Sequence, residues 1–123
     1  MLQTGLLTAL ITLTTLTAPS PAPSPIPGDP KAGAAVFMTK TCSVCHAVKK
    51  IKAEGTIGPS LDKIGTIAAK RVKGQSAEVY LRKSILEPNA YITPGYQPFM
   101  PELGPTMTDK EFRDLLAFLK SLK

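Results

Sequence analysis

Residues 42–46 read Cys-Ser-Val-Cys-His, and this short run constrains the chain more than any other part of it. Two cysteines three positions apart share one face of a helical turn, so both sulfurs can reach the two vinyl groups along one edge of a haem. The histidine that follows can turn its ring under the iron, where a neutral imidazole nitrogen is a good axial ligand. Cys42 and Cys45 therefore predict covalent attachment of one haem c, and His46 predicts its proximal ligand.

The same three side chains fit other kinds of site less well. A structural zinc site needs four Cys or His ligands, and the whole chain holds two cysteines and one histidine. A thioredoxin-like dithiol would stand beside an alternating strand–helix pattern, which this sequence lacks. A simple disulfide between the two cysteines of an exported protein remains an alternative, although it would leave His46 without a role.

The chain divides into three parts by composition. Residues 1–18 are apolar and uncharged, and predict a signal-like segment or a membrane anchor. Residues 19–28 are rich in proline and predict an extended tether. All charged side chains lie in residues 29–123, which we expect to be the folded haem domain. An uncleaved anchor is favoured, because no Lys or Arg precedes the apolar run and the candidate cleavage-site alanines are followed by proline. We therefore expect a periplasmic or otherwise extracytoplasmic domain.

The formal net charge is +6, from 15 Lys and Arg against 9 Asp and Glu. Such a surface suits acidic redox proteins or an anionic membrane face. Nucleic acid is not expected as a partner, because the basic residues are scattered and no aromatic stacking platform accompanies them. The basic side chains nearest to the cysteine motif, which are candidates for docking, are Lys40, Lys49, Lys50 and Lys52. A run of charges is equally well explained as a solvated face.

Helix signals occur in three places. Asp29 can cap a first helix with Pro30 at its first position, and the helix continues over about 31–40. Ser76 can cap a second helix, which Pro88 ends. We expect three or four helices in all and almost no strand.

The last helix has the clearest signals. Thr108 and Glu111 form a capping box, and an apolar stripe follows at helical spacing, made of Phe112, Leu115, Leu116 and Leu119. On the first helix, Gly33 allows a close approach and Phe37 can interlock. These features predict that the first and last helices cross tightly.

With one histidine in the chain, the second axial ligand of the iron must be another kind of residue. Met1 lies beyond the tether, Met38 is too close to Cys42, and Met107 is expected to pack beside the last helix cap. Met100 lies in a loop stiffened by three prolines, Pro94, Pro98 and Pro101. We therefore predict that Met100 is the second ligand, which would raise the reduction potential of the iron.

Four segments, taken in order, carry a family resemblance: Cys42-Ser43-Val44-Cys45-His46, Gly58-Pro59-Ser60-Leu61, Tyr91-Ile92 through Met100-Pro101, and Leu115-Leu116-Ala117-Phe118-Leu119-Lys120. Together they resemble class I cytochromes c, which carry a single haem with His and Met ligands, over residues 29–123. The stretch from 76 to 101 looks closest to haem domains of bacterial terminal oxidases and to small bacterial carriers.

The resemblance implies an all-α cytochrome c fold wrapped around one haem, with the N- and C-terminal helices crossing. It also implies that the carbonyl of Pro59 accepts a hydrogen bond from the second ring nitrogen of His46. This sequence departs from the family in having no tryptophan to bind a haem propionate, and Arg71 is the candidate for that role. Phe37 stands five residues before Cys42, so we expect a small bulge between them.

If His46 and Met100 both bind iron, no coordination position is open for a substrate. The expected function is then electron transfer between extracytoplasmic or membrane partners, and the protein is not an enzyme. One alternative is a fixed haem subunit of an oxidase or dehydrogenase complex, which would expose a large apolar patch. A more distant alternative is a ligand-responsive haem sensor with a weakly held Met100.

Overall fold

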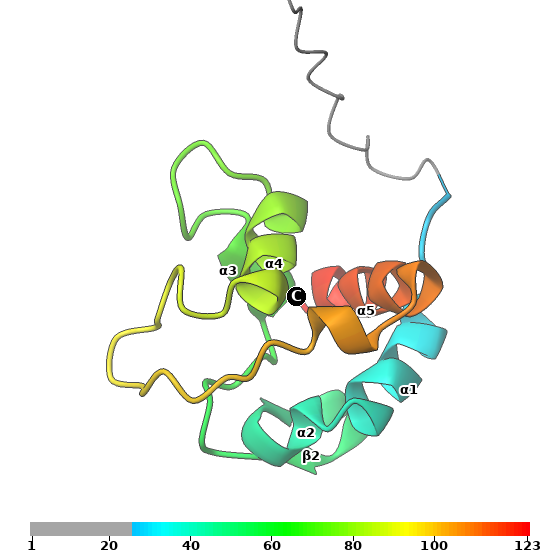
Figure 1. Ribbon diagram of the computed structural model, residues 1–123, viewed down its shortest axis with the longest axis horizontal. Coiled ribbons are helices and arrows are strands. Elements are labelled where there is room, and N and C mark those ends of the chain that lie inside the picture. The colour runs from blue at the N-terminus through cyan, green and yellow to red at the C-terminus, as the bar shows by residue number, and fades with distance from the viewer. Residues whose placement is uncertain (1–25) are drawn as a thin grey trace, which may run out of the picture.

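Helices α1 (Pro30–Thr39) and α5 (Asp109–Ser121) lie against each other on one side of the molecule (Figure 1). They belong to a computed structural model that describes residues 26–123. Helix α4 (Ala77–Leu86) packs beside α5, and α2 (Cys42–Cys45) follows α1 at the bottom of the view. The mostly helical fold expected from the sequence is confirmed.

The three predicted helices begin where their capping residues indicated. The carboxylate of Asp29 accepts a hydrogen bond from the Lys31 N–H at 2.8 Å, with Pro30 at the first position of α1. The Ser76 hydroxyl accepts the Val79 N–H at 3.2 Å at the start of α4. Thr108 and Glu111 complete the capping box of α5 in both directions.

The interface between α1 and α5 is close because Gly33 has no side chain. A Cβ atom at Gly33 would overlap the backbone carbonyl of Asp114 and lie 2.7 Å from the Cβ of Phe118. Phe37 then meets Phe118 edge to face, with ring centroids 5.7 Å apart. The predicted tight crossing is confirmed, and Leu115 and Leu116 of the α5 stripe are each 1% exposed.

The structure also contains short elements, of which only the helical turn of the cysteine motif, α2, was expected from the sequence. Helix α3 (Ile64–Ala68) and α2 are one turn long, and the 3₁₀ helices are η1 (Lys49–Ile51) and η2 (Gly104–Thr106). Strands β1 (Ala47–Val48) and β2 (Ala53–Glu54) form a small antiparallel hairpin. Helices this short have no periodic stripe of their own, and neither α2 nor α3 has a side-chain cap, so tertiary packing must hold them.

The irregularity expected between Phe37 and Cys42 lies at Thr41. Helix α1 ends at Thr39, and Thr41 adopts a left-handed conformation with φ 63° before α2 begins. The chain changes direction here, so α2 runs along a different axis from α1 (Figure 1), and both of its cysteines are partly buried.

The structure describes only a small part of the predicted anchor and tether segments. The expected signal or anchor segment, residues 1–18, and most of the tether, residues 19–28, lie outside the described residues. Gly28, which composition assigns to the tether, already packs against the Arg113 backbone of α5. Within residues 26–123, no helix has both the length and the apolar composition needed to cross a bilayer.

Candidate functional site

A cavity of about 460 Å³ lies between α2, α4, α5 and the loop that joins α4 to α5. We call residues 88–107 the Met100 loop. The cavity wall is mostly apolar and includes Phe37 of α1, Ile64 of α3, Leu81 of α4 and Leu119 of α5. Its volume falls within the range of about 300–1,000 Å³ that small-molecule and cofactor sites occupy.

His46 is held in one orientation at this wall. Its Nδ1 lies 2.8 Å from the carbonyl oxygen of Pro59, which can only accept a hydrogen bond, so Nδ1 donates. Burial lowers the pKa of the His46 ring, although the Pro59 bond opposes this, and the neutral ring then keeps its lone pair on Nε2. The bond to Pro59 that the resemblance implied is therefore present, and it leaves Nε2 able to bind a metal.

Gly58 permits this placement of the histidine. A Cβ atom at Gly58 would lie 2.6 Å from Cε1 of His46, and the Gly58 N–H donates to the Cys45 carbonyl at 2.8 Å. Any side chain at this position would displace the ring from Pro59. Residue type alone did not reveal this packing role, because Gly58 and His46 meet only after the β1–β2 hairpin returns the chain.

Cys42 and Cys45 both line the cavity, beside His46. They are free thiols in this structure and are not joined by a disulfide. Burial raises the pKa of the Cys42 thiol, although a hydrogen bond to the backbone opposes this. One short helix, α2, therefore presents two sulfurs, and the histidine that follows it, to one mostly apolar space.

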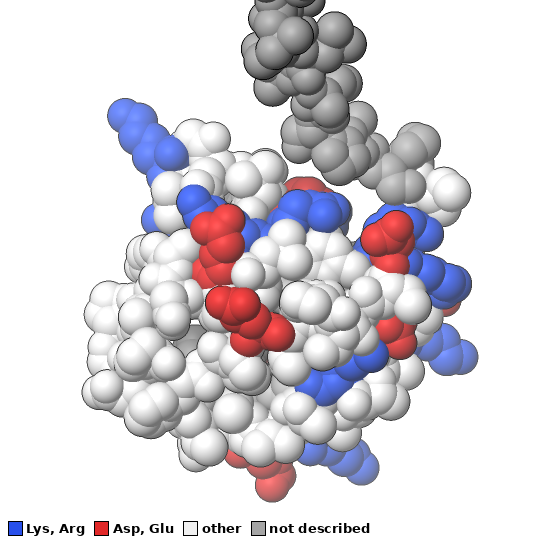
Figure 2. Space-filling model, in the orientation of Figure 1, with Lys and Arg blue, Asp and Glu red and all other residues white. Residues whose placement is uncertain are grey.

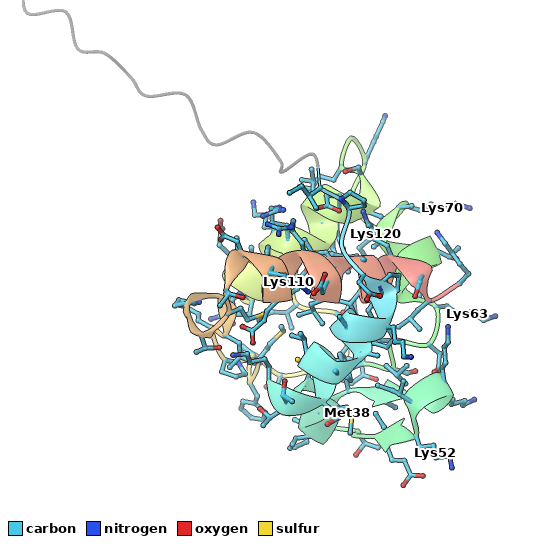
Figure 3. The ribbon with its side chains drawn as sticks, turned by 90° about the vertical axis from the view of Figure 1, so that its right-hand side faces the viewer. Met38, Lys52, Lys63, Lys70, Lys110 and Lys120 are labelled. Carbon is cyan, nitrogen blue, oxygen red and sulfur yellow. The ribbon has the colours of Figure 1, made fainter. Side chains whose placement is uncertain are left out.

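Met100 lines the same cavity from the Met100 loop. Its side chain is partly buried and packs against the core. Met107 also lines the cavity, so position alone does not distinguish these two methionines. Met38 is 47% exposed on α1 and is not among the cavity residues, which agrees with its exclusion on sequence grounds (Figure 3).

Arg71 reaches the cavity wall from the segment after α3. Its Nη1 donates to the hydroxyl of Thr93 at 3.1 Å. Its guanidinium lies 5.3 Å from the ring centroid of Tyr91 and 5.9 Å from that of Tyr80. Arg71 is therefore oriented by groups that the sequence did not connect with it, and no spacing signal could have paired residues 22 positions apart.

The four lysines expected to form a docking group do not behave alike. Lys40 is turned inward, since its ammonium donates to the Thr106 carbonyl at 2.6 Å and lies 3.4 Å from a carboxylate oxygen of Glu111. Lys49, Lys50 and Lys52 are exposed. Lys40 is therefore not available as a surface charge in the way its neighbours are.

The Met100 loop is uncharged over residues 88–101. In the view of Figure 2, charged side chains lie at the top, the right, the centre and the lower edge, and the left edge, where Figure 1 places this loop, carries none. Val44, Ile57 and Phe99 line the cavity and are 62%, 55% and 68% exposed. The cavity is thus bordered by an exposed apolar rim, which we define by these three residues.

The residues present fit a covalently held haem. Cys42 and Cys45 are placed to hold it, and His46 offers a neutral nitrogen fixed by the Pro59 bond. The surrounding wall is apolar, and Arg71 is its one fully charged side chain within the described residues. This donor set and wall suit a large, flat, mostly apolar cofactor whose iron needs nitrogen and sulfur ligands.

Comparison with known proteins agrees with this geometry. The family model described as cytochrome c matches residues 30–123. A cytochrome c from Ginkgo biloba is 34% identical over 106 residues, which cover 76% of this chain and 88% of that protein. The likeness of residues 76–101 to bacterial haem domains is tested by neither match and stays a prediction. The motifs, the fold and both matches show that the chain belongs to the cytochrome c family, as a class I c-type cytochrome, and this family supports haem-based electron transfer.

Proposed function

We propose that this protein carries one electron at a time on a haem c attached through Cys42 and Cys45, with His46 and Met100 as the iron ligands. The observation that carries the proposal is that these four side chains line one apolar cavity. When bound, haem c supplies an iron that gains and loses one electron.

The protein's own residues have separate tasks in this scheme. Pro59 keeps the His46 ring in one tautomer, which leaves Nε2 with a lone pair that would bind the metal. The Met100 thioether would supply the second protein ligand and would raise the reduction potential of the iron. The apolar wall excludes water. With His46 and Met100 both bound to the iron, no site would be left where a substrate could bind to it, so the protein would act as an electron carrier and not as an enzyme.

The first test is a carbon monoxide challenge of the reduced, haem-loaded protein, followed by its absorption spectrum. On mixing, we expect no immediate change for the wild type, which should bind carbon monoxide only slowly, and rapid, full conversion to a carbon monoxide spectrum for Met100→Ala. Met107→Ala is the matched control, because Met107 lines the same cavity, and it should stay unreactive. A wild-type protein that binds carbon monoxide at once, or a Met107→Ala variant that alone becomes reactive, would contradict Met100 ligation.

For its partners, we propose acidic-surfaced electron donors and acceptors that are steered by Lys49, Lys50 and Lys52. These lysines follow α2, which carries the two cysteines. Lys49 is 91% exposed and lies 4.0 Å from Asp62, so its charge is largely available to a partner. Electrostatic steering raises association rates at low salt and is screened over a length of about 10 Å at 0.1 M salt.

The docking proposal is tested by reversing charges at two sites. The double variant Lys49→Glu, Lys50→Glu should slow electron transfer with an acidic partner at least about tenfold at low salt, and less at high salt. The control is Lys70→Glu, Lys73→Glu. These residues lie in the segment between α3 and α4, at the opposite end of the molecule from α2 (Figure 1), and Figure 3 shows Lys70 projecting well away from Lys52. Equal slowing by both pairs would show that only the net charge matters.

We also propose a periplasmic or otherwise extracytoplasmic location, with residues 1–18 as an uncleaved membrane anchor. The support is the cysteine motif together with the uncharged apolar start of the chain. Expression of the full chain should leave the haem protein in the membrane fraction, resistant to a salt wash. Recovery of a shortened protein in the soluble extracytoplasmic fraction would instead identify residues 1–18 as a cleaved signal.

The exposed apolar rim of Val44, Ile57 and Phe99 supports a second candidate, a fixed haem subunit of an oxidase or dehydrogenase complex. Exposed apolar patches often mark protein interfaces. A fixed subunit would copurify with its complex at high salt, whereas a carrier steered by lysines would dissociate. Size-exclusion chromatography of gently solubilised membranes at two salt concentrations separates these candidates.

A further inference from the structure

Two cationic side chains form hydrogen bonds with the Met100 loop, one before Met100 in the sequence and one after it. Thr93 lies seven residues before Met100 and Thr106 lies six residues after it. Arg71 donates to the Thr93 hydroxyl at 3.1 Å, and Lys40 donates to the Thr106 carbonyl at 2.6 Å. Each bond crosses a long sequence separation, 22 residues for Arg71 and 66 residues for Lys40.

These two bonds are the only hydrogen bonds that tie residues 88–107 to distant parts of the chain within residues 26–123. The loop's backbone bonds are local, such as Tyr96 N–H to Thr93 and Met107 N–H to Gly104. The loop is therefore joined to the rest of the molecule mainly by apolar contacts and by these two donors. Removal of either donor frees one end of the segment that carries Met100.

The segment between Met100 and Thr106 is stiff enough to transmit this restraint. Pro101 and Pro105 fix two of its backbone torsions, and η2 (Gly104–Thr106) adds a helical turn. Gly104 packs directly on Leu86, where a Cβ atom would lie 2.5 Å from the leucine side chain. A restraint on the Thr106 carbonyl thus limits where Met100 can move.

We propose that Lys40 is a positioning residue that clamps the Met100 loop closed, with Arg71 and Thr93 as the second clamp at the other end of the loop. This inference rests on the proposed function, because it takes Met100 as the iron ligand. It assigns to Lys40 a role in keeping the axial position closed, instead of the role in docking that its place in the sequence suggested.

The test is the rate of carbon monoxide binding to the reduced, haem-loaded protein. Lys40→Met keeps the aliphatic stem but removes the donor, and should accelerate binding about tenfold, which corresponds to about 1.4 kcal/mol, close to the worth of one hydrogen bond to a charged group. Thr93→Val removes the other clamp and should accelerate binding about threefold. Lys31→Met, at an exposed lysine of the same helix, should leave the rate unchanged.

Two further variants isolate the bond to Thr106. Lys40→Arg keeps a cationic donor and should restore most of the wild-type rate. Glu111→Gln removes the ion pair with Lys40 but keeps an oxygen for the capping box, and should behave nearly as the wild type. If Glu111→Gln accelerates carbon monoxide binding as much as Lys40→Met does, then loss of the ion pair between Lys40 and Glu111 explains the acceleration. The clamp proposal is then wrong.

A second readout separates a clamp from general stability. During urea unfolding of the oxidised protein, the absorption band of the sulfur–iron bond and the helical circular dichroism are followed together. In Lys40→Met the band should disappear at a lower urea concentration than in the wild type, while the helical transition moves less. If both transitions shift together, Lys40 has a structural role only and the proposal is overturned.

The remaining outcomes are also decisive. If Lys40→Met does not fold, Thr93→Val carries the test, and a wild-type rate in that variant overturns the proposal. If both variants fold and bind carbon monoxide as slowly as the wild type, the clamp is wrong while Met100 ligation stands. If the wild type itself binds carbon monoxide at once, Met100 ligation fails and the clamp fails with it.

Discussion

The α1–α5 pair and the Met100 loop both line the cavity, but they are held in different ways. The helices meet through buried side chains and the missing side chain of Gly33, with Phe37 against Phe118. The loop has local backbone hydrogen bonds, several exposed apolar side chains and two long-range polar ties, through Lys40 and Arg71.

This difference assigns separate tasks to the two regions. The α1–α5 pair forms one wall of the cavity, and the burial of apolar area between the two helices stabilises it. The loop supplies a ligand that must stay in place yet depends on few contacts, which makes it the region of lower local stability. Substitutions in the α1–α5 pair should therefore lower the free energy of unfolding, whereas substitutions in the Met100 loop should weaken the hold of Met100 on the iron.

Hydrogen exchange of the haem-loaded protein should show the largest difference. Interior amides of α5 are expected to exchange only through global unfolding, at about 5–15 kcal/mol. Amides of the Met100 loop are expected to exchange through local opening at about 0–2 kcal/mol. The measurement is exchange followed by NMR or mass spectrometry. Equal protection of the two regions would show that the loop is as firmly held as the helices.

Gly33→Ala should be the most damaging single substitution in the helix pair. The added methyl would overlap the Asp114 carbonyl and crowd Phe118, so the helices must separate. We expect a loss of about 3 kcal/mol in the free energy of unfolding, measured by urea denaturation. Ala35→Leu adds bulk at an exposed position of the same helix and should change stability by less than about 0.5 kcal/mol. Equal effects would contradict the close packing.

Asp114→Asn tests the polar part of the same interface. The Asp114 carboxylate accepts the Asp29 N–H at 2.8 Å and the Lys110 ammonium at 2.6 Å, and these bonds hold its pKa below its usual range. The ionised form therefore stabilises the fold above about pH 4, and the gain is lost as the pH falls through the lowered pKa of the folded state.

At pH 7 we expect Asp114→Asn to cost about 1 kcal/mol in the free energy of unfolding. The difference from the wild type should shrink steadily below pH 4, because the wild-type carboxyl then becomes neutral as well. Urea denaturation from pH 7 to pH 3 measures it, with Glu54→Gln as an exposed control. A difference that does not depend on pH would show that shape, and not charge, matters at this position.

The smallest effect is expected from the ion pair that joins α4 to α5. Lys120 lies 2.6 Å from a carboxylate oxygen of Glu78. Burial opposes ionisation of Glu78, but the hydrogen bonds from Lys120 and Arg82 outweigh it and lower the pKa of this carboxyl. Since both side chains are about one-third or more exposed, Lys120→Met should cost only about 0.5 kcal/mol.

High salt should abolish most of the Lys120→Met effect, and Lys123→Met serves as a control at the exposed end of the chain. Denaturation at low and high salt is the measurement. If the loss in the free energy of unfolding persists in high salt, the contact between Lys120 and Glu78 stabilises the protein by more than a screened surface ion pair would.

The sequence by itself determined the parts of this protein that depend on neighbouring residues. The spacing of Cys42, Cys45 and His46 predicted their common face, and the caps at Asp29, Ser76 and Thr108 predicted where three helices begin. Such signals act within one helical turn, so they can be read without knowing the fold. The stripe on α5 predicted a buried face, and Gly33 with Phe37 supplied its partner.

Only the tertiary structure decided the contacts between distant residues. Helix α3 has no side-chain cap, and its formation depends on packing against α4 and α5. Gly58 packs against the His46 ring only because the β1–β2 hairpin reverses the direction of the chain between them. Lys40 looked like a surface charge, but the fold brings the Thr106 carbonyl, 66 residues away, within hydrogen-bonding distance of its ammonium. A side chain's type sets which bonds it can make, whereas the folded path of the chain sets which partner it meets.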